Sequence, residues 1–290
     1  MSRSFKTLLA RPRPLIAPIA HDALSARMIA DAGFEAVGLA GSSLLAAQYA
    51  LPDIGLAGLA EMAESARLVL RGHNLPWGMD ADDGFGDLKN VVLTVRTLEA
   101  LACGQIILED QLRLGKRPGD AAAQALVTPE DMVAKVRIAC DTRQDRDGLM
   151  IIARTDAFPN GGMDEALRRA DSYLKAGADG IFVSGLQSSE ELRIVGEHFR
   201  GANPVAVVGE RKIRVWPAPD ELYAMGFNQI SYPSLLLLRA VSGIEQALAD
   251  MAALASGALA PKDVVNCERQ ADALTCHLRL EEWNRLGGLG

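Results

Sequence analysis

The sequence predicts an α/β protein with the architecture of a (β/α)8 TIM-type barrel and an extra C-terminal helix. First, an amphipathic stretch that ends in a small residue and glycine is followed by a short β-prone run at Gly33, Gly104, Gly177 and Gly226. Second, further β-prone runs lie between these units, which gives eight runs that alternate with helical stretches. Such alternation produces parallel strands with right-handed crossovers, and eight units in roughly 250 residues fit a closed barrel.

The four glycines mark helix ends, because glycine adopts the left-handed conformation after a last helical turn without a Cβ clash. The predicted strands cover residues 14–20, 34–41, 75–81, 105–110, 148–157, 178–185, 203–209 and 227–233. An open doubly wound sheet is the alternative architecture. No GxGxxG motif opens a helix in this sequence, which disfavours a dinucleotide-binding fold of that kind.

After the eighth strand, residues 233–256 and 262–286 are predicted to be helical, with the segment SGALAPKD between them. We therefore expect a barrel domain over residues 1–256 and a C-terminal helical extension over residues 257–290. The extension has an apolar side made of Leu278, Leu280, Trp283 and Leu286. This side is suited either to packing on another subunit or to covering one end of its own barrel.

Composition excludes several classes of protein. The 290 residues carry a net charge of −7 and show no basic patch that could follow a phosphate backbone. We find neither a signal peptide nor an apolar run of membrane-spanning length, so a cytoplasmic protein is expected. The four cysteines and four histidines have no metal-ligand spacing, which disfavours a zinc site.

Acidic residues gather where the predicted strands end. Asp80 and Asp82 end the third strand, and Glu109 ends the fourth. Residues two apart in an extended strand point the same way, and the carboxyl ends of barrel strands meet at one mouth. Carboxylates that converge there would repel one another unless a cation is bound, and hard oxygen ligands favour Mg²⁺, with Mn²⁺ as an alternative. The neighbouring Asp83 and Asp87 are better explained as turn and helix caps.

Two further features suggest an anion site at the same mouth. Arg154 ends the fifth strand and would either neutralise a nearby carboxylate or bind a substrate carboxylate in a fork. Gly41, Ser42 and Ser43 follow the second strand and lead into a helix, whose backbone N–H groups could hold a carboxylate or phosphate. A plain helix cap is the alternative for this loop.

With these residues the chain resembles the isocitrate lyase/phosphoenolpyruvate mutase superfamily, over about residues 15–245. The matching motifs are HDALSARMIADAGFEAV from residue 21, LPD (51–53), DADDGFG (80–86), LED (108–110), TPEDMVAKVRIACD (128–141), IIARTDA (151–157) and AGADGIF (176–182). The resemblance implies a (β/α)8 barrel in a homotetramer that exchanges a C-terminal helix between subunits. It also implies Mg²⁺ and a small 2-oxo or 2-hydroxy acid as substrate.

Carried over by position, Asp82 resembles the direct metal ligand, and Asp80 and Glu109 resemble ligands that act through water. Asp53 and Arg154 resemble substrate-pocket residues. Ala40, Gly41 and Ser42 occupy the family's carboxylate-binding loop, where isocitrate-type lyases have Ser-Gly-Gly. The departures at positions 40 and 42 leave the side-chain contacts of this loop open.

The segment that resembles the family's catalytic gate departs further. Isocitrate and methylisocitrate lyases carry a Lys-Lys/Arg-Cys-Gly-His signature whose cysteine transfers a proton, whereas this chain has KRPGD at residues 116–120. Proline cannot transfer a proton. Downstream, only Glu210 remains of the family's Asn-x-Thr-Glu stretch. Lys116 either reaches the site or lies on the surface, and it joins Arg154 and Asp53 as a catalytic candidate.

The expected function is therefore that of a Mg²⁺-dependent carbon–carbon lyase, with decarboxylation of oxaloacetate to pyruvate as the leading reaction. Decarboxylation needs no dedicated base to begin, and the metal stabilises the enolate that forms. One alternative is cleavage of methylisocitrate or a substituted malate with another acid, such as Asp120. The others are a phosphonopyruvate-type P–C bond enzyme and a non-catalytic member that binds a dicarboxylate.

Overall fold

The computed structural model describes residues 4–113, 116, 125–208, 216–260 and 267–288. Within it, residues 1–235 and 236–290 form two separate compact units. Across the described ranges, no helix is both long enough and apolar enough to cross a membrane.

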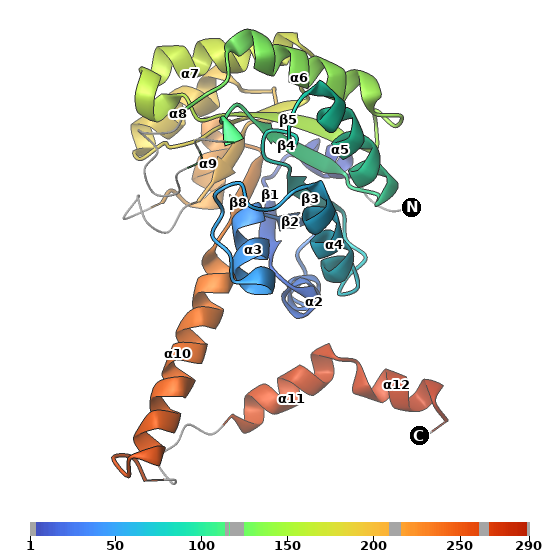
Figure 1. The fold of residues 1–290 in the computed structure, drawn as a ribbon, viewed down its shortest axis with the longest axis vertical. Helices are drawn as coiled ribbons and strands as arrows, with labels where there is room; N and C mark the ends of the chain where they lie inside the picture. The colour runs from blue at the N-terminus through green and yellow to red at the C-terminus, as the bar shows by residue number, and fades with distance from the viewer. Residues whose placement is uncertain (1–3, 114–115, 117–124, 209–215, 261–266, 289–290) are drawn as a thin grey trace. The chain divides into compact units, whose positions relative to one another are not determined.

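The first unit is an eight-stranded parallel barrel, as the sequence predicts (Figure 1). The strands are β1 (Leu15–Ala20), β2 (Val37–Leu39), β3 (Trp77–Asp80), β4 (Gln105–Glu109), β5 (Met150–Thr155), β6 (Gly180–Val183), β7 (Val205–Val207) and β8 (Gln229–Tyr232). Neighbours in the sheet follow the order β6-β5-β4-β3-β2-β1-β8-β7. A single parallel bridge between Ile181 of β6 and Pro204, the residue before β7, links the two ends of this order, so the barrel is nearly closed.

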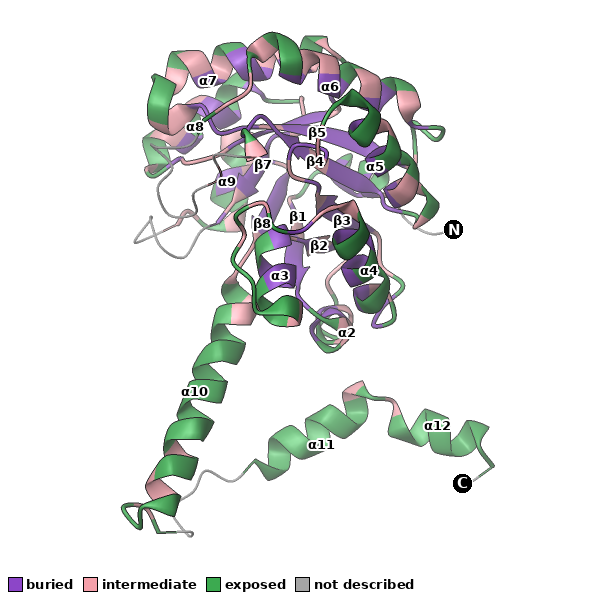
Figure 2. Cartoon of the chain, in the orientation of Figure 1, coloured by how far each residue is buried: buried purple, intermediate pink, exposed green. Residues whose placement is uncertain are grey.

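Helices alternate with these strands around the barrel. They are α2 (Ala23–Asp31), α3 (Gly41–Tyr49), α4 (Leu59–Leu70), α5 (Leu88–Ala100), α6 (Pro129–Thr142), α7 (Phe158–Lys175), α8 (Ser189–His198) and α9 (Pro219–Met225). The strands are the buried layer and the helices expose their outer faces (Figure 2). This is the pattern expected of a parallel sheet covered by amphipathic helices.

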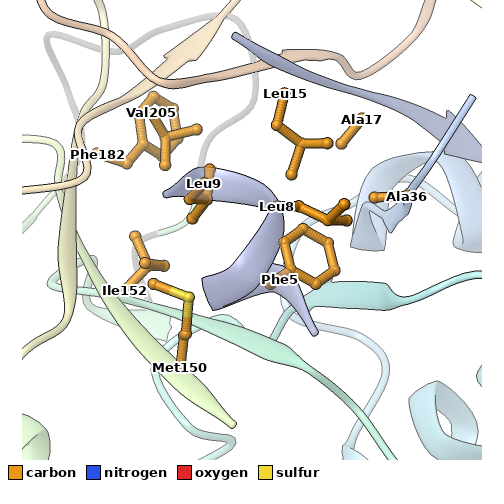
Figure 3. Close-up of a cluster of buried hydrophobic side chains, with 10 residues drawn as sticks. All are labelled: Phe5, Leu8, Leu9, Leu15, Ala17, Ala36, Met150, Ile152, Phe182 and Val205. Atoms are coloured by element: carbon orange, nitrogen blue, oxygen red, sulfur yellow. The ribbon is translucent and has the colours of Figure 1, made fainter. Parts of the chain in front are cut away.

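A short helix that the sequence did not predict, α1 (Phe5–Leu9), closes the amino end of the barrel. Ser4 caps it, since its Oγ accepts a hydrogen bond from the N–H of Thr7. Phe5, Leu8 and Leu9 pack into a buried cluster with the starts of several strands (Figure 3). The other members of this cluster are Leu15, Ala17, Ala36, Met150, Ile152, Phe182 and Val205. Because apolar side chains fill this end, polar chemistry is left to the carboxyl ends of the strands.

The second unit contains most of α10 (Leu235–Ala255), then α11 (Glu268–His277) and α12 (Leu280–Leu286). The single helix expected over residues 262–286 was wrong, because Arg279 has a left-handed backbone (φ 58°) that separates α11 from α12. The four apolar residues predicted to form one side are all exposed, Trp283 at 68%. No residue of α10, α11 or α12 is buried within the described part of the chain (Figure 2).

Candidate functional site

The three acidic residues predicted to hold a metal lie together at the carboxyl ends of β3 and β4. Asp80 is the last residue of β3, Glu109 is the last residue of β4, and Asp82 follows two residues after Asp80. Each offers one carboxylate oxygen, and these oxygens lie within 4.8 Å of one another. The side chain of Glu109 is only 1% exposed. A set of three hard oxygen donors at this spacing, one buried and two half-buried, suits a small divalent cation.

Asp82 reaches this cluster by a turn rather than by continuing an extended strand. The prediction that Asp80 and Asp82 share a strand face was therefore wrong in its geometry, although the two side chains do converge. Asp82 has a left-handed backbone (φ 46°), which aspartate tolerates better than most residues. Its N–H donates to Asp80 Oδ1 at 3.4 Å, and its carbonyl accepts from the N–H of Glu109 at 2.8 Å.

Lys116 lies inside the cluster, which decides between the two alternatives left open for it. Its Nζ is 2.6 Å from Asp82 Oδ1, 3.0 Å from Asp53 Oδ1 and 3.4 Å from Glu109 Oε1. The side chain is 8% exposed. Burial on its own would lower the pKa of Lys116, but the surrounding carboxylates outweigh it and raise that pKa. The residue is therefore a protonated ammonium held by several carboxylates at once.

Arg154 is also held by carboxylates. Its Nε and Nη2 donate to the two oxygens of Asp156 at 2.8 and 2.9 Å, and its Nη1 is 2.9 Å from Glu109 Oε2. The guanidinium also lies over the ring of Phe182, 5.2 Å from its centroid. Asp156 occupies the Nε/Nη2 edge of the guanidinium, one of the two edges that can fork a carboxylate. The geometry therefore favours the interpretation that Arg154 neutralises nearby carboxylates. Its Nη1 is the atom that faces Glu109 and Asp80, two of the proposed metal ligands.

The cluster holds more negative than positive charge. Among the described residues, Asp53, Asp80, Asp82, Glu109 and Asp156 face Lys116 and Arg154, with Arg113 3.5 Å from Asp82. Burial raises the pKa of Asp80 to about 6 and that of Glu109 well above its usual value, although Arg154 opposes both shifts. Burial also acts on Asp156, but Arg154 outweighs it and lowers the pKa. A further cation would relieve this imbalance.

Arg113, a residue that the sequence analysis did not identify, connects the loop containing Asp53 to the acidic cluster. Asp53 contacts Lys116, and its side chain is 18% exposed. Arg113 donates to the carbonyl of Ala57 and lies near Asp82 and Asp83, at 3.5 and 3.8 Å. It also stacks over the ring of Phe85, 5.5 Å from the centroid. Only its position shortly before the KRPGD segment could have indicated such a role.

The predicted anion loop begins next to Asp82. A Cβ built on Gly41, the first residue of α3, would lie 3.9 Å from Asp82 Oδ1. Ala40 has extended backbone and supplies no side-chain cap to this helix. Ser42 is exposed, whereas the hydroxyl of Ser43 donates to the carbonyl of Pro233 at 2.7 Å. The loop is thus adjacent to the acidic cluster, and its role in binding an anion stays a prediction.

The capping interpretations of Asp83 and Asp87 are confirmed. Asp87 is the N-cap of α5 and accepts from the N–H groups of Lys89 and Asn90. Asp83 accepts from the N–H of Phe85 at 3.0 Å and pairs with Lys135 at 3.3 Å. Neither belongs to the set of three possible metal ligands.

A second polar cluster, also missed from sequence, lies one residue beyond Glu109. Asp110 is fully buried and accepts hydrogen bonds from the hydroxyls of Thr155 and Tyr173, at 2.7 and 2.8 Å. It also accepts from the N–H of Asp156 at 2.9 Å and from Arg169 at 3.2 Å. We call this set the Asp110 network. It fixes the backbone of Asp156, whose carboxylate in turn holds Arg154.

Residues Arg117–Asp120 of the KRPGD segment and Glu210 lie outside the described residues. The expectations for Pro118, Asp120 and Glu210 therefore remain sequence-based.

Comparison with known proteins shows that this chain is similar to enzymes. The family model described as phosphoenolpyruvate phosphomutase matches residues 5–252. The chain is 38% identical to 2,3-dimethylmalate lyase of Eubacterium barkeri over 230 residues, which cover 79% of this chain and 78% of that protein. It is also 38% identical to probable 2-methylisocitrate lyase 1 of Corynebacterium glutamicum over 253 residues, or 86% of this chain and 81% of that protein.

The solved structure of phosphonopyruvate hydrolase in complex with oxalate and Mg²⁺ resembles this chain with a TM-score of 0.79 and 25% identity. The match covers 98% of this chain and 99% of that one.

Proposed function

Because the chain belongs to the phosphoenolpyruvate phosphomutase family, within the isocitrate lyase/PEP mutase superfamily, we propose that it is a Mg²⁺-dependent enzyme that decarboxylates oxaloacetate to pyruvate. The two relatives described above are named as lyases, and this chain is a carbon–carbon lyase as well. The proposal concerns the metal, the residues that act and the acid that is cleaved.

The convergence of Asp80, Asp82 and Glu109 carries the proposal. Their oxygens lie within 4.8 Å of one another and form an all-oxygen donor set of the kind that Mg²⁺ prefers. Glu109 Oε2 is buried without a well-oriented hydrogen bond among the described residues, although Arg154 lies near it. An under-coordinated buried oxygen in a cluster with excess negative charge fits a cation ligand. The donor chemistry therefore fits the metal that the Mg²⁺–oxalate complex of phosphonopyruvate hydrolase contains.

When bound, Mg²⁺ supplies a Lewis acid that polarises the 2-oxo group of the substrate and stabilises negative charge on its oxygen. Asp82, Asp80 and Glu109 would hold the ion. The N–H groups at the start of α3, at Gly41 and Ser42, would hold the carboxylate next to the oxo group. Arg154 keeps Glu109 and Asp80 in place while Asp156 fixes the guanidinium.

In the proposed reaction the bond between C3 and the C4 carboxylate breaks, CO₂ leaves, and the electron pair forms the enolate of pyruvate. A proton then returns to C3 to complete pyruvate. We assign delivery of this proton to Lys116, whose ammonium lies at the acidic cluster. Decarboxylation is favoured over aldol cleavage because Pro118 stands where the lyases have their proton-transferring cysteine.

Cleavage of a 2-substituted malate is the second candidate, and the curated relatives favour it. Both relatives described above are named for such acids, 2,3-dimethylmalate and 2-methylisocitrate. This reaction needs a base that removes the proton of the 2-hydroxyl group and an acid that protonates the carbon of the departing enolate. Asp53 is the candidate for the base, and Asp120 is the sequence-based candidate for the acid.

The two reactions differ in their products. Purified protein with Mg²⁺ is expected to release pyruvate and CO₂ from oxaloacetate faster than Mg²⁺ alone does. Cleavage of 2,3-dimethylmalate or 2-methylisocitrate would release pyruvate without CO₂.

We expect Asp82→Ala to lower the rate of pyruvate release about 10³-fold, since it removes a ligand to the Lewis acid. Asp87→Ala is the matched control, because Asp87 lies in the same acidic stretch and only caps α5. Equal rates for wild type and Asp82→Ala would contradict the proposed metal site.

A further inference from the structure

Lys116 contacts two of the three proposed metal ligands through one atom. Its Nζ is 2.6 Å from Asp82 Oδ1 and 3.4 Å from Glu109 Oε1, and it is also 3.0 Å from Asp53. The side chain is largely shielded from solvent. The other buried lysine nearby, Lys135, instead pairs with Asp83, which is not one of the three metal candidates.

An ammonium at this position and a divalent ion would compete for the same oxygens. Mg²⁺ binds carboxylate oxygens at about 2.0–2.1 Å, so an ion on Asp82 Oδ1 would lie within a few ångströms of an ammonium at 2.6 Å from that oxygen. Repulsion between a double and a single positive charge is large at such separations when both are shielded from water. Binding of either cation therefore disfavours the other at these oxygens.

The charges of the cluster support such an exchange. Without a metal, Lys116 is the cation that touches Asp53, Asp82 and Glu109 together, whereas Arg154 is held by Asp156, Glu109 and Asp80. The Asp156 fork and the stacking on Phe182 fix Arg154 in place. Lys116 has a flexible stem and no such fork, so it is the cation that can move.

We infer that Lys116 is an internal competitor of the divalent ion, and that metal binding displaces its ammonium from Asp82 and Glu109. The inference rests on the proposed function, because it assumes that these carboxylates bind the metal. Its consequence is that the ammonium becomes available to a substrate only after the metal has bound. Metal binding and the release of the Lys116 ammonium toward the substrate then occur together.

Calorimetric titration of Mg²⁺ into metal-free protein tests this inference without substrate or turnover. Lys116→Met removes the charge and retains an unbranched stem. We expect it to bind Mg²⁺ at least about tenfold more tightly than wild type, because no ammonium has to be displaced. Lys89→Met is the control for the loss of one positive charge, since Lys89 is exposed and pairs with the capping Asp87. It should bind Mg²⁺ as wild type does.

The outcomes separate the inference from the proposed function. If wild type and Lys116→Met bind Mg²⁺ equally, or if the variant binds more weakly, the competition is refuted and the metal site stands. If neither protein binds Mg²⁺, both the competition and the proposed metal site are refuted.

A measurement on wild-type protein covers the case in which Lys116→Met does not fold. Acetylation of lysines by a small amine-reactive reagent, read by mass spectrometry, should modify Lys116 slowly without metal because it is buried and paired. Saturating Mg²⁺ should increase that rate several-fold, while Lys89 serves as an internal standard. A rate at Lys116 that Mg²⁺ leaves unchanged would refute the inference.

Discussion

Two consecutive carboxylates at the end of β4 have opposite surroundings. Glu109 and Asp110 are 1% and 0% exposed, so both are removed from water. Asp110 accepts hydrogen bonds from Thr155, Tyr173, Arg169 and the backbone of Asp156. Glu109 instead faces other carboxylates, and only Lys116 and Arg154 among the described residues offset its charge.

This difference distinguishes a carboxylate that supports the fold, Asp110, from one that we propose binds a metal ion, Glu109. Burial raises the pKa of Asp110 as well, but the hydrogen bonds from Asp156, Thr155 and Tyr173 oppose that shift and help the site to tolerate a buried charge. A buried charge whose neighbours carry the same sign reduces stability, and such arrangements are concentrated at functional sites. The contrast predicts that substitutions of the two residues change the stability of the metal-free protein in opposite directions.

The largest expected effect on stability is the loss of the Asp110 network. Asp110→Ala leaves the hydroxyl of Tyr173 buried without its acceptor and removes one of the two anions near Arg169. We expect the free energy of unfolding to fall by about 3–5 kcal/mol, the usual cost of breaking a buried charged network. Urea unfolding of the metal-free protein measures it.

Tyr173→Phe provides the matched control for this prediction. It removes one donor from Asp110 and leaves the other three. Its cost should be about 1–2 kcal/mol. A loss below 1 kcal/mol for Asp110→Ala would show that the network is not a main support of the barrel and would remove the contrast with Glu109.

The sequence predicted the barrel because the signal is local and repeated. Each predicted strand overlaps an observed one, and the strand ends placed Asp80, Asp82 and Glu109 at the same mouth. Local patterns did not predict α1, whose five residues are fixed by packing against strand starts far along the chain. Nor did they predict the break at Arg279, which interrupts an otherwise helical pattern.

Side-chain partners were the least predictable part of the site. Lys116 meets Asp53 and Asp82, which are distant from it in the chain, so only the folded barrel brings the three together. The Asp110 network likewise joins the end of β4 to β5 and α7. The resemblance supplied candidate roles for Asp53 and Arg154, but it did not indicate that Asp156 occupies the forked edge of Arg154.

The second expected effect concerns Glu109. Burial raises the pKa of Glu109, which means that the folded protein favours its neutral form. Glu109→Gln imitates that form, and Lys116 and Arg154 keep other carboxylate partners in Asp53, Asp82 and Asp156. We therefore expect metal-free Glu109→Gln to be more stable than wild type at neutral pH, by about 1–2 kcal/mol.

Glu109→Gln should also weaken Mg²⁺ binding, because it removes one charge from the proposed ligand set. Urea unfolding with a chelator and calorimetry with Mg²⁺ give the two readouts. If metal-free Glu109→Gln is less stable than wild type, Glu109 stabilises the fold as Asp110 does, and the proposed difference between the two residues is refuted.

The third expected effect is a pH dependence that comes from Asp80. Burial raises the pKa of Asp80 from its ordinary 3.8 to about 6, so the folded protein holds this proton more tightly than the unfolded chain does. Stability from this group is therefore greatest below about pH 4 and is lost as the pH rises to about 6, with a slope of at most about 1.4 kcal/mol per pH unit. The free energy of unfolding of metal-free wild type should fall relative to that of Asp80→Asn across this interval. Parallel curves for the two proteins would mean that burial does not raise the pKa of Asp80. In that case only Glu109 would distinguish the acidic cluster from the Asp110 network.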